Sequence, residues 1–188
     1  MYDNWDDLEK LINGCNKCDL CKNRMNILFG CGNKEADVMF IGEAPSNDED
    51  ANNKLFACTS GKLLNMAFEG LEINKDNIYY TNVVKCKVNA EQVPKVNEIS
   101  ACLNYLRNQV ILIKPKIIVL LGNTALKTIL GNENNMLAVR GNWFNHKGIF
   151  YMPTWHPAAL LRDENKKIEF WEDLKKVKQK ANNENMII

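Results

Sequence analysis

The seven cysteines of this 188-residue chain are the residues with the most specific chemistry. Cys15 and Cys18 have two residues between them, a spacing at which two thiolates can bind one metal centre from a single turn. Because no separate second pair of this spacing follows, Cys86 and Cys102 are the expected completion of a four-thiolate site. The spacing alone leaves zinc and an iron–sulfur cluster equally open.

The remaining cysteines, Cys21, Cys31 and Cys58, are interpreted as small buried apolar residues or idle thiols. In a reducing cytosol, an odd and unevenly spaced set of cysteines indicates metal ligands rather than disulfides. We expect a cytoplasmic protein because the N-terminus is acidic and lacks the apolar segment of a signal peptide. No apolar run approaches the roughly 18 residues of a membrane span, so no membrane partner is expected.

Three further side chains have positions that suit chemistry. Glu43 lies between Gly42 and Ala44 at the end of a predicted strand, where a carboxylate can face a ligand crevice. His156 precedes a proline, which suits the first turn of a helix whose free N–H groups can bind an anion. Phe56 lies in a loop of small residues and is interpreted either as core or as a stacking platform for a flat ring.

Strands and helices alternate along the chain, which predicts a parallel sheet covered by helices on both faces. Short apolar runs predict strands over 38–41, 78–84, 117–122 and 149–152. Apolar residues at three- and four-residue steps predict helices over 4–14, 61–68, 96–113, 123–130 and 166–181. Residues 142–148 are predicted to form a hairpin or a surface loop. We expect one domain, 1–188, with the cysteine-rich segment at its N-terminal end.

Ligands of such sheets bind outside the carboxyl ends of the strands. Polar or glycine-containing segments of this chain fall there and together predict the site: Gly42-Glu43-Ala44-Pro45, Thr81-Asn82, Gly122-Asn123 and His156-Pro157. The formal net charge of +1, from 24 basic and 23 acidic residues, gives no global positive field. A nucleic-acid partner would therefore be held by a local basic face.

Taken together, these segments resemble the family 4 uracil-DNA glycosylases, the iron–sulfur branch of the uracil-DNA glycosylase superfamily. The resemblance runs from Cys15 to Val177, nearly the whole chain. It is carried by motifs whose order and spacing are jointly specific: Cys15-x2-Cys18-x-Leu20; Gly42-Glu43-Ala44-Pro45 with Glu49-Asp50; Phe56 with Gly61-x-Leu63-Leu64; Thr81-Asn82-Val83-Val84-Lys85-Cys86; Glu98-x3-Cys102; Leu121-Gly122-x2-Ala125; Arg140-Gly141; and His156-Pro157-Ala158-Ala159-Leu160-Leu161-Arg162.

The resemblance implies an α/β protein, a three-layer α/β/α fold with a four-stranded parallel sheet, and we expect a monomer. It implies an enzyme that hydrolyses the N-glycosidic bond of deoxyuridine in single- or double-stranded DNA. Uracil would be released and an abasic site left for base-excision repair. The resemblance also favours iron–sulfur over zinc: a structural [4Fe–4S] cluster held by Cys15, Cys18, Cys86 and Cys102.

The resemblance implies roles for the residues around the flipped base. Phe56 would stack on the uracil ring. Asn82 would read the Watson–Crick edge by pairing its carbonyl with N3–H and its amide with O4. His156, near uracil O2, would stabilise the negative charge of the departing base.

Water and DNA would be held by further residues. Glu43 would position the attacking water with backbone groups of Gly42 and Ala44, and its charge can balance the sugar cation. On the DNA side, the leucine pair would either wedge into the gap left by the flipped base or pack a short helix, and basic residues would hold phosphates. These DNA-binding candidates are Lys85, Arg140, Leu160, Leu161 and Arg162.

The chain departs from the family pattern in its binding loops. Ser46 stands where the family usually has glycine, and residues 87–94 replace an arginine- and proline-rich segment and add Glu91. The residues assigned to chemistry are intact, so we predict an active enzyme whose base specificity is open to change. Two alternatives stand beside it: a non-catalytic or altered-specificity DNA-binding protein on the same fold, for example one acting on another deaminated base, and a zinc protein of unrelated function.

Overall fold

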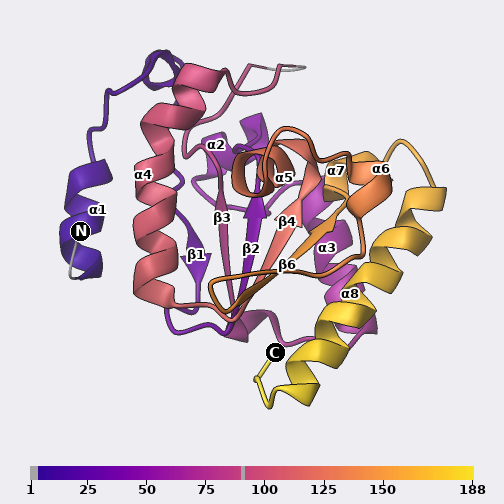
Figure 1. Ribbon diagram of the computed structural model, residues 1–188. Helices are drawn as coiled ribbons and strands as arrows, with labels where there is room; N and C mark the ends of the chain where they lie inside the picture. Colours follow the sequence, from indigo (N-terminus) through magenta and orange to yellow (C-terminus); the bar gives the residue numbers. More distant parts are fainter. Residues whose placement is uncertain (1–3, 90–91) are drawn as a thin grey trace.

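Six strands form one sheet in the computed structural model, which describes residues 4–89 and 92–188 (Figure 1). The strand order is β1-β3-β2-β4-β6-β5. The strands span Cys31–Gly32 (β1), Val38–Gly42 (β2), Ile78–Asn82 (β3), Ile117–Leu121 (β4), Phe144–His146 (β5) and Ile149–Thr154 (β6). The four inner strands are parallel, as predicted. Two short antiparallel strands extend the sheet beyond the predicted four, and one of them, β5, forms a hairpin with β6.

Helices connect the strands close to where apolar periodicity predicts them. Their bounds are Trp5–Ile12 (α1), Asn47–Asn52 (α2), Thr59–Gly70 (α3), Val96–Ile113 (α4), Gly122–Leu130 (α5), Met136–Val139 (α6), Pro157–Leu160 (α7) and Asn165–Asn183 (α8). Two 3-10 turns span Asp19–Lys22 and Lys75–Asn77. Within the described residues, no helix is both long and apolar enough to cross a membrane. Glu91, the acidic residue of the altered loop, lies outside the described residues.

Helix α2 occupies a segment for which the sequence pattern predicts no helix. Ser46 is its N-cap: the Ser46 hydroxyl accepts from the Glu49 N–H at 3.3 Å, and a Glu49 carboxylate oxygen accepts from the Ser46 N–H at 2.8 Å. This reciprocal pair satisfies two N–H groups that a helix start otherwise leaves free. The serine that departs from the family pattern is therefore explained by its capping of α2.

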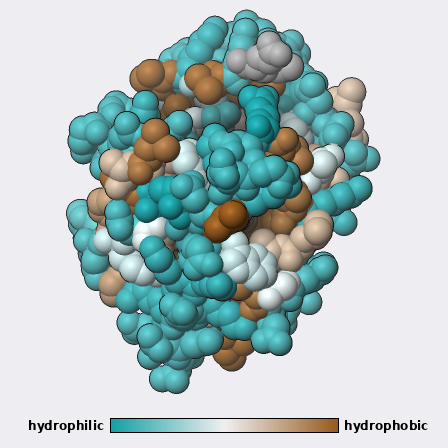
Figure 2. All heavy atoms as spheres, turned by 90° about the vertical axis from the view of Figure 1, so that its right-hand side faces the viewer, coloured by the Kyte–Doolittle hydropathy of each residue, from teal (hydrophilic) through white to brown (hydrophobic). Residues whose placement is uncertain are grey.

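The helices cover both faces of the sheet, which confirms the three-layer α/β/α fold (Figure 1). Helices α1 and α4 pack on one face and contribute Leu8, Ile12, Tyr105 and Leu106 to its core. Helices α3, α7 and α8 pack on the other and contribute Leu64, Phe68, Leu160, Phe170 and Leu174. All residues of β2, β3 and β4 are buried, as expected for parallel strands between two helical layers. The outer surface on the α8 side is mostly hydrophilic (Figure 2).

The carboxyl ends of the four parallel strands lie at one edge of the sheet, at the top of Figure 1. The register pairs Gly42 with Asn82 and Leu121 with Thr154, so these strands end almost level with one another. Helix α5 begins directly after β4, and two residues separate the end of β6 from the start of α7. Side chains at the strand ends and helix starts therefore share this edge, where α/β sheets bind their ligands.

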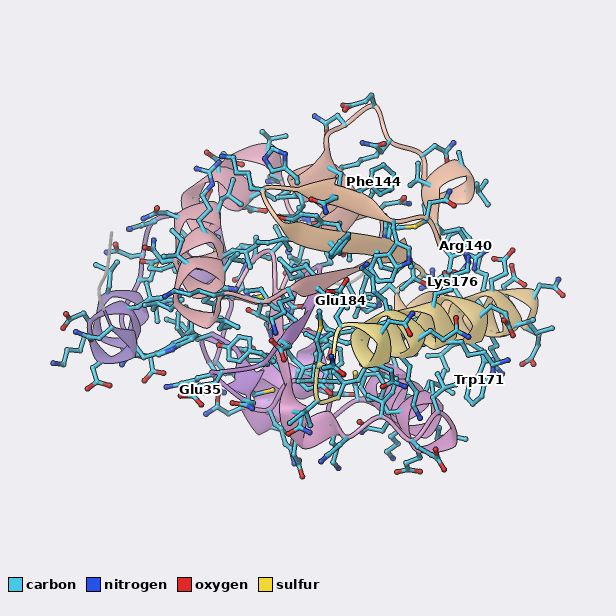
Figure 3. The ribbon with its side chains drawn as sticks, turned by 60° about the horizontal axis from the view of Figure 1, so that its bottom comes forward. Glu35, Arg140, Phe144, Trp171, Lys176 and Glu184 are labelled. Carbon is cyan, nitrogen blue, oxygen red and sulfur yellow. The ribbon has the colours of Figure 1, made fainter. Side chains whose placement is uncertain are left out.

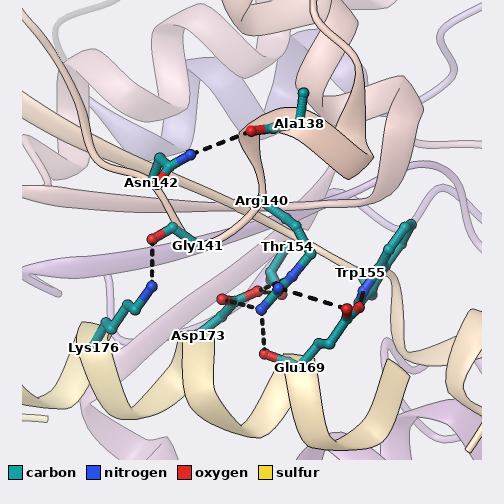
Figure 4. A network of polar contacts seen from close by, with 9 residues as sticks. All are labelled: Ala138, Arg140, Gly141, Asn142, Thr154, Trp155, Glu169, Asp173 and Lys176. Atoms are coloured by element: carbon teal, nitrogen blue, oxygen red, sulfur yellow. Dashed lines mark hydrogen bonds and ion pairs between the residues drawn. The ribbon is translucent and has the colours of Figure 1, made fainter. Parts of the chain in front are cut away.

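A polar network fixes the end of β6 against α8 (Figure 4). Two of its residues are labelled in Figure 3, where Arg140 lies close to α8 and Lys176 lies on that helix. Arg140 donates to both carboxylate oxygens of Asp173, at 2.5 and 3.0 Å, and to the Glu169 carbonyl at 2.6 Å. Thr154 donates to the same Asp173 carboxylate at 2.6 Å. The guanidinium of Arg140 is thus bonded to partners within the protein, and a DNA phosphate contact by Arg140 stays a prediction.

We predict that Asp173→Ala lowers the free energy of unfolding by about 3 kcal/mol, because it leaves the mostly buried Arg140 charge without its partner. The matched control is Glu172→Ala on the same helix. Its exposed ion pair with Lys175, at 3.0 Å, should contribute less than about 1 kcal/mol. Chemical denaturation followed by circular dichroism measures both, and equal losses would contradict the role of the network.

Candidate active site

Two polar side chains meet at Gly42, the last residue of β2. A Cβ atom placed on Gly42 would lie 2.3 Å from Asn82 Oδ1 and 3.5 Å from His156 Nε2. Asn82 ends β3 and His156 precedes α7, so the fold brings together residues that are far apart in the sequence. Asn82 is 3% exposed, and its carboxamide has no hydrogen bond with any of the described residues. A buried carboxamide without a protein partner is available to pair with a ligand.

His156 presents an uncharged N–H donor toward Gly42. The backbone N–H of Ala158 donates to His156 Nδ1 at 3.2 Å. This bond assigns the lone pair to Nδ1 and the hydrogen to Nε2, the atom that faces Gly42. Burial lowers the pKa of His156 to about 4, which keeps the imidazole neutral near pH 7.

Glu43 lies one residue beyond Gly42 and is anchored by the first turn of α5. The Thr124 hydroxyl donates a short hydrogen bond to a Glu43 carboxylate oxygen. The same turn begins with Gly122, whose φ is +84° and where a Cβ atom would lie 3.0 Å from the Cβ atom of His156. The start of α5 therefore contacts both the carboxylate and the histidine, and only a small residue fits between them.

The loop that carries Phe56 is fixed at several points. The φ angle of Phe56 is 56°, which is rare for a bulky residue. Its N–H donates to the Glu49 carboxylate at 2.5 Å, and a Cβ atom on Gly61 would come within 1.9 Å of its carbonyl oxygen. The Phe56 ring lies 5.2 Å from the Tyr80 ring. Tyr80 and Asn82 point to the same face of the sheet because they are two residues apart on β3, so Phe56 lies on that face as well.

Phe56 also borders a groove of about 850 Å³ beside β1 and β3. Tyr80 and three lysines, Lys54, Lys62 and Lys75, line the same groove. Neither Asn82 nor His156 lines it. The stacking role of Phe56 therefore stays a prediction.

The four predicted cysteine ligands line one cavity between the N-terminal segment and α4. Cys15 and Cys18 follow α1, Cys86 follows β3, and Cys102 lies on α4. Cys21 also lines this cavity. The interpretation of Cys21 as a small buried residue or an idle thiol does not predict this position. The other two cysteines do not line the cavity.

Hydrogen-bond donors face the sulfur atoms of this cavity. Arg24 Nη1 donates to Cys86 Sγ at 3.1 Å, and Nη2 donates to the Cys15 carbonyl at 2.6 Å. Burial raises the pKa of Cys86 to about 11 and also raises the pKa of Cys18 and Cys102. These thiols would therefore ionise by exchanging their protons for a metal. No group of three or more His, Cys, Asp or Glu residues within 4–89 and 92–188 is arranged to hold a metal ion.

Asp50 connects the cysteine segment to the loop before Phe56. Its carboxylate accepts from the N–H groups of Met25 and Asn26, at 2.9 and 2.8 Å, and lies 3.4 Å from Lys87 Nζ. Asp50 is fully buried. The sequence resemblance includes Asp50 in a motif but gives it no role, and nothing in the sequence marks Arg24. Arg24 bonds to the segments of Cys15 and Cys86, and Asp50 joins residues 25 and 26 to α2. The sequence motifs contain Cys15, Cys86 and Asp50 but do not predict these contacts.

Two residues predicted to contact DNA are buried. Lys85 is 1% exposed, and burial lowers its pKa to about 7. Leu160 is 3% exposed and packs in the core. This burial does not support a phosphate contact for Lys85 or a wedge role for Leu160, and both stay predictions. The packing of Leu160 agrees with the alternative in which the leucine pair packs a short helix. Leu161, which is 52% exposed, and Arg162 lie at the surface directly after it.

The fold and the site define the class of protein. The sheet of an α/β/α fold places an amide, a histidine and a carboxylate at its strand ends, and a separate cavity is lined by the four predicted cysteine ligands and Cys21. The sequence profile of the uracil DNA glycosylase superfamily matches residues 29–175, and the chain belongs to this superfamily.

Within the superfamily, the chain is similar to several type-4 uracil-DNA glycosylases. The chain is 39% identical to the Type-4 uracil-DNA glycosylase of Sulfurisphaera tokodaii, covering 94% of this chain and 86% of the relative. It is 37% identical to that of Saccharolobus solfataricus, with the same coverage, and 33% identical to that of Archaeoglobus fulgidus, covering 92% and 90%. The resemblance drawn from the motifs is confirmed.

We predict that His156 titrates with a midpoint near pH 4, which NMR can follow with the exposed His146 as the second histidine signal. Because the folded-state pKa lies below the ordinary value of about 6.5, unfolding takes up a proton between these two values. The contribution of His156 to the free energy of unfolding should therefore fall as pH is lowered through that window. A midpoint above pH 6 would contradict the neutral imidazole.

Proposed function

We propose that this chain is a uracil-DNA glycosylase that hydrolyses the N-glycosidic bond of deoxyuridine in DNA and leaves an abasic site. The observation that carries the proposal is the meeting of the Asn82 carboxamide and His156 Nε2 at Gly42. The Asn82 carboxamide can form hydrogen bonds with a flipped base, and His156 Nε2–H can stabilise the negative charge that develops on the base as it departs. The match to the superfamily and the type-4 relatives support the same activity.

Asn82 discriminates uracil from cytosine. Its carbonyl accepts from uracil N3–H, and its amide donates to O4. Cytosine offers an acceptor and a donor in the opposite order, so both Asn82 groups would be left unpaired. A good bidentate pair is worth about 1–3 kcal/mol of discrimination. Because the carboxamide is buried and has no hydrogen bond with the described residues, reading the base requires no competing bond to be broken.

His156 stabilises the leaving group. Breaking the bond between the sugar C1′ and uracil N1 leaves the electron pair, and hence negative charge, on the base. A neutral Nε2–H donor near uracil O2 stabilises this charge, and one such donor typically lowers the barrier by about 3 kcal/mol. The neutral state suits this role because it needs no prior proton uptake at pH 7.

Glu43 orients the water that attacks C1′. Its hydrogen bond from Thr124 fixes one carboxylate oxygen and leaves the other for the water. The negative charge also stabilises the positive sugar in the transition state. Backbone groups of Gly42 and Ala44 lie beside it to share in holding the water.

Cys15, Cys18, Cys86 and Cys102 would hold a [4Fe–4S] cluster. The shared cavity and the Arg24 donor facing Cys86 Sγ support this assignment, because iron–sulfur clusters are held by four thiolates whose properties depend on such hydrogen bonds. When bound, the cluster cross-links three chain segments and takes no part in the hydrolysis.

The partner is uracil-containing DNA, single- or double-stranded, bound by a monomer. Flipping the base costs a few kcal/mol and least in single strands. Of the residues predicted to contact DNA, Leu161 and Arg162 are exposed to solvent and can therefore reach a DNA strand. Arg162 would hold a phosphate, and Leu161 would fill the gap left by the flipped base.

We predict that the protein releases uracil from oligonucleotides with one deoxyuridine and leaves an alkali-sensitive abasic site. Asn82→Ala and His156→Ala should each lower the single-turnover rate by about 100-fold or more. The matched controls Asn145→Ala and His146→Ala remove the same side-chain types from the exposed β5 hairpin and should retain the rate.

No abasic product from uracil, hypoxanthine, xanthine or thymine opposite guanine, with iron-loaded protein, would contradict the proposed function. Uracil-dependent DNA binding without turnover would instead support the non-catalytic alternative. Release of another deaminated base in place of uracil would support altered specificity.

We predict that Cys102→Ser loses most of its iron, whereas Cys31→Ser retains about four iron atoms per chain. Cys102 lines the cavity, whereas Cys31 lies on β1 away from it. Iron and sulfide analysis with visible absorbance measures the difference. Equal iron in both variants, or zinc in place of iron, would contradict the cluster assignment.

A further inference from the structure

Lys85 is a fully enclosed lysine with three oxygen partners. Its Nζ donates to the Thr81 hydroxyl at 2.5 Å, to the Asn82 carbonyl at 2.6 Å and to the Gln109 side-chain oxygen at 2.7 Å. Three acceptors match the three donors of an ammonium group. A buried cation is costly unless it is fully hydrogen-bonded, so its partners must be held in place.

The partners of Lys85 are themselves anchored. The Gln109 amide donates to the Phe29 carbonyl at 2.8 Å and to the Tyr79 hydroxyl at 3.0 Å. The Thr81 hydroxyl lies 2.8 Å from the same Phe29 carbonyl. Lys85 therefore bonds to a fixed framework made from α4, β3 and the segment before β1.

The framework reaches the base-reading residue through one peptide group. The carbonyl of Asn82 accepts from Lys85 Nζ, and the N–H on the other side of that peptide, from Val83, donates to the Gly42 carbonyl at 2.9 Å. The peptide that follows Asn82 is thus held at both ends. Its orientation fixes the backbone from which the Asn82 side chain extends toward Gly42.

We propose that Lys85 is a positioning residue for base recognition: its ammonium group fixes the Asn82 carbonyl and so aims the Asn82 carboxamide at the base. The proposal rests on the proposed function, in which Asn82 reads uracil. It replaces the phosphate contact expected from the sequence. Lys85 touches neither DNA nor base and acts only through Asn82.

A double-mutant cycle between Lys85 and Asn82 tests the proposal. Lys85→Met keeps the length of the side chain and removes its donors. In the wild-type background, we expect a loss of about 10- to 100-fold in the single-turnover rate of uracil release, since small misplacements of a positioning group cost this much. In the Asn82→Ala background, the same substitution should cost less than about threefold, because residues that act as a unit are not additive.

Other roles of Lys85 would give different results. A phosphate contact would weaken DNA binding and reduce its salt dependence, with no coupling to Asn82. A general structural role would lower the rate equally in both backgrounds. The matched control Lys116→Met changes a lysine at the opposite end of the strands and should leave the rate unchanged. All rates are expressed per iron-loaded protein.

Two further measurements keep the test decisive. A crystal structure of Lys85→Met should show the Asn82 carboxamide displaced from Gly42, and an unmoved Asn82 would overturn the proposal. If Lys85→Met does not retain iron, Gln109→Leu replaces it, with a smaller loss expected and the same dependence on Asn82. A wild type that releases no uracil contradicts the proposed function, whereas normal release by Lys85→Met contradicts only the positioning role.

Discussion

The site depends on the absence of a side chain at the end of β2. The parallel register places Gly42 opposite Asn82, and the chain after β6 brings His156 to the same point. Any Cβ atom at this position would collide with Asn82 Oδ1 and crowd His156 Nε2. Glycine is therefore required because two functional groups need the volume beside the backbone. The sheet supplies rigid strand ends, and the glycine leaves the space between them in which a base can be read.

Buried ionisable side chains, together with apolar packing, hold the segments around this space. Lys85 fixes the Asn82 backbone, the Glu49 carboxylate holds the N–H of Phe56, and Asp173 holds Thr154, two residues before His156. Ionic hydrogen bonds are directional and become costly when one partner is lost. They add little net stability compared with apolar side chains of the same size. The advantage of these ionic hydrogen bonds is that each one is formed in only one arrangement of the backbone segment that it holds.

The sequence predicts the architecture well because the inner strands and long helices have clear apolar patterns. It also predicts that Asn82, Glu43 and His156 lie at one sheet edge, since all three lie at or close after the carboxyl ends of strands. It does not predict the burial of Lys85 and Arg140, which it places at the DNA surface. Charged side chains are usually exposed, and the partners that bury these two, such as Gln109 and Asp173, lie far away in the sequence. Such pairings follow from the fold and not from local patterns.

The cysteine cavity and the active-site edge share the same supports. Lys85 directly precedes Cys86, and its carbonyl accepts from the Leu28 N–H at 2.8 Å, while Asp50 joins the segment after Arg24 to α2. Helix α1 has only eight residues, shorter than the roughly 12–15 at which isolated helices become stable. The N-terminal segment therefore depends on contacts outside the helix, such as the packing of Leu8 and Ile12 in the core beside α4. A cluster bound by its cysteines would add a cross-link to this packing, and its loss would loosen the framework on which Asn82 depends without removing any reacting group.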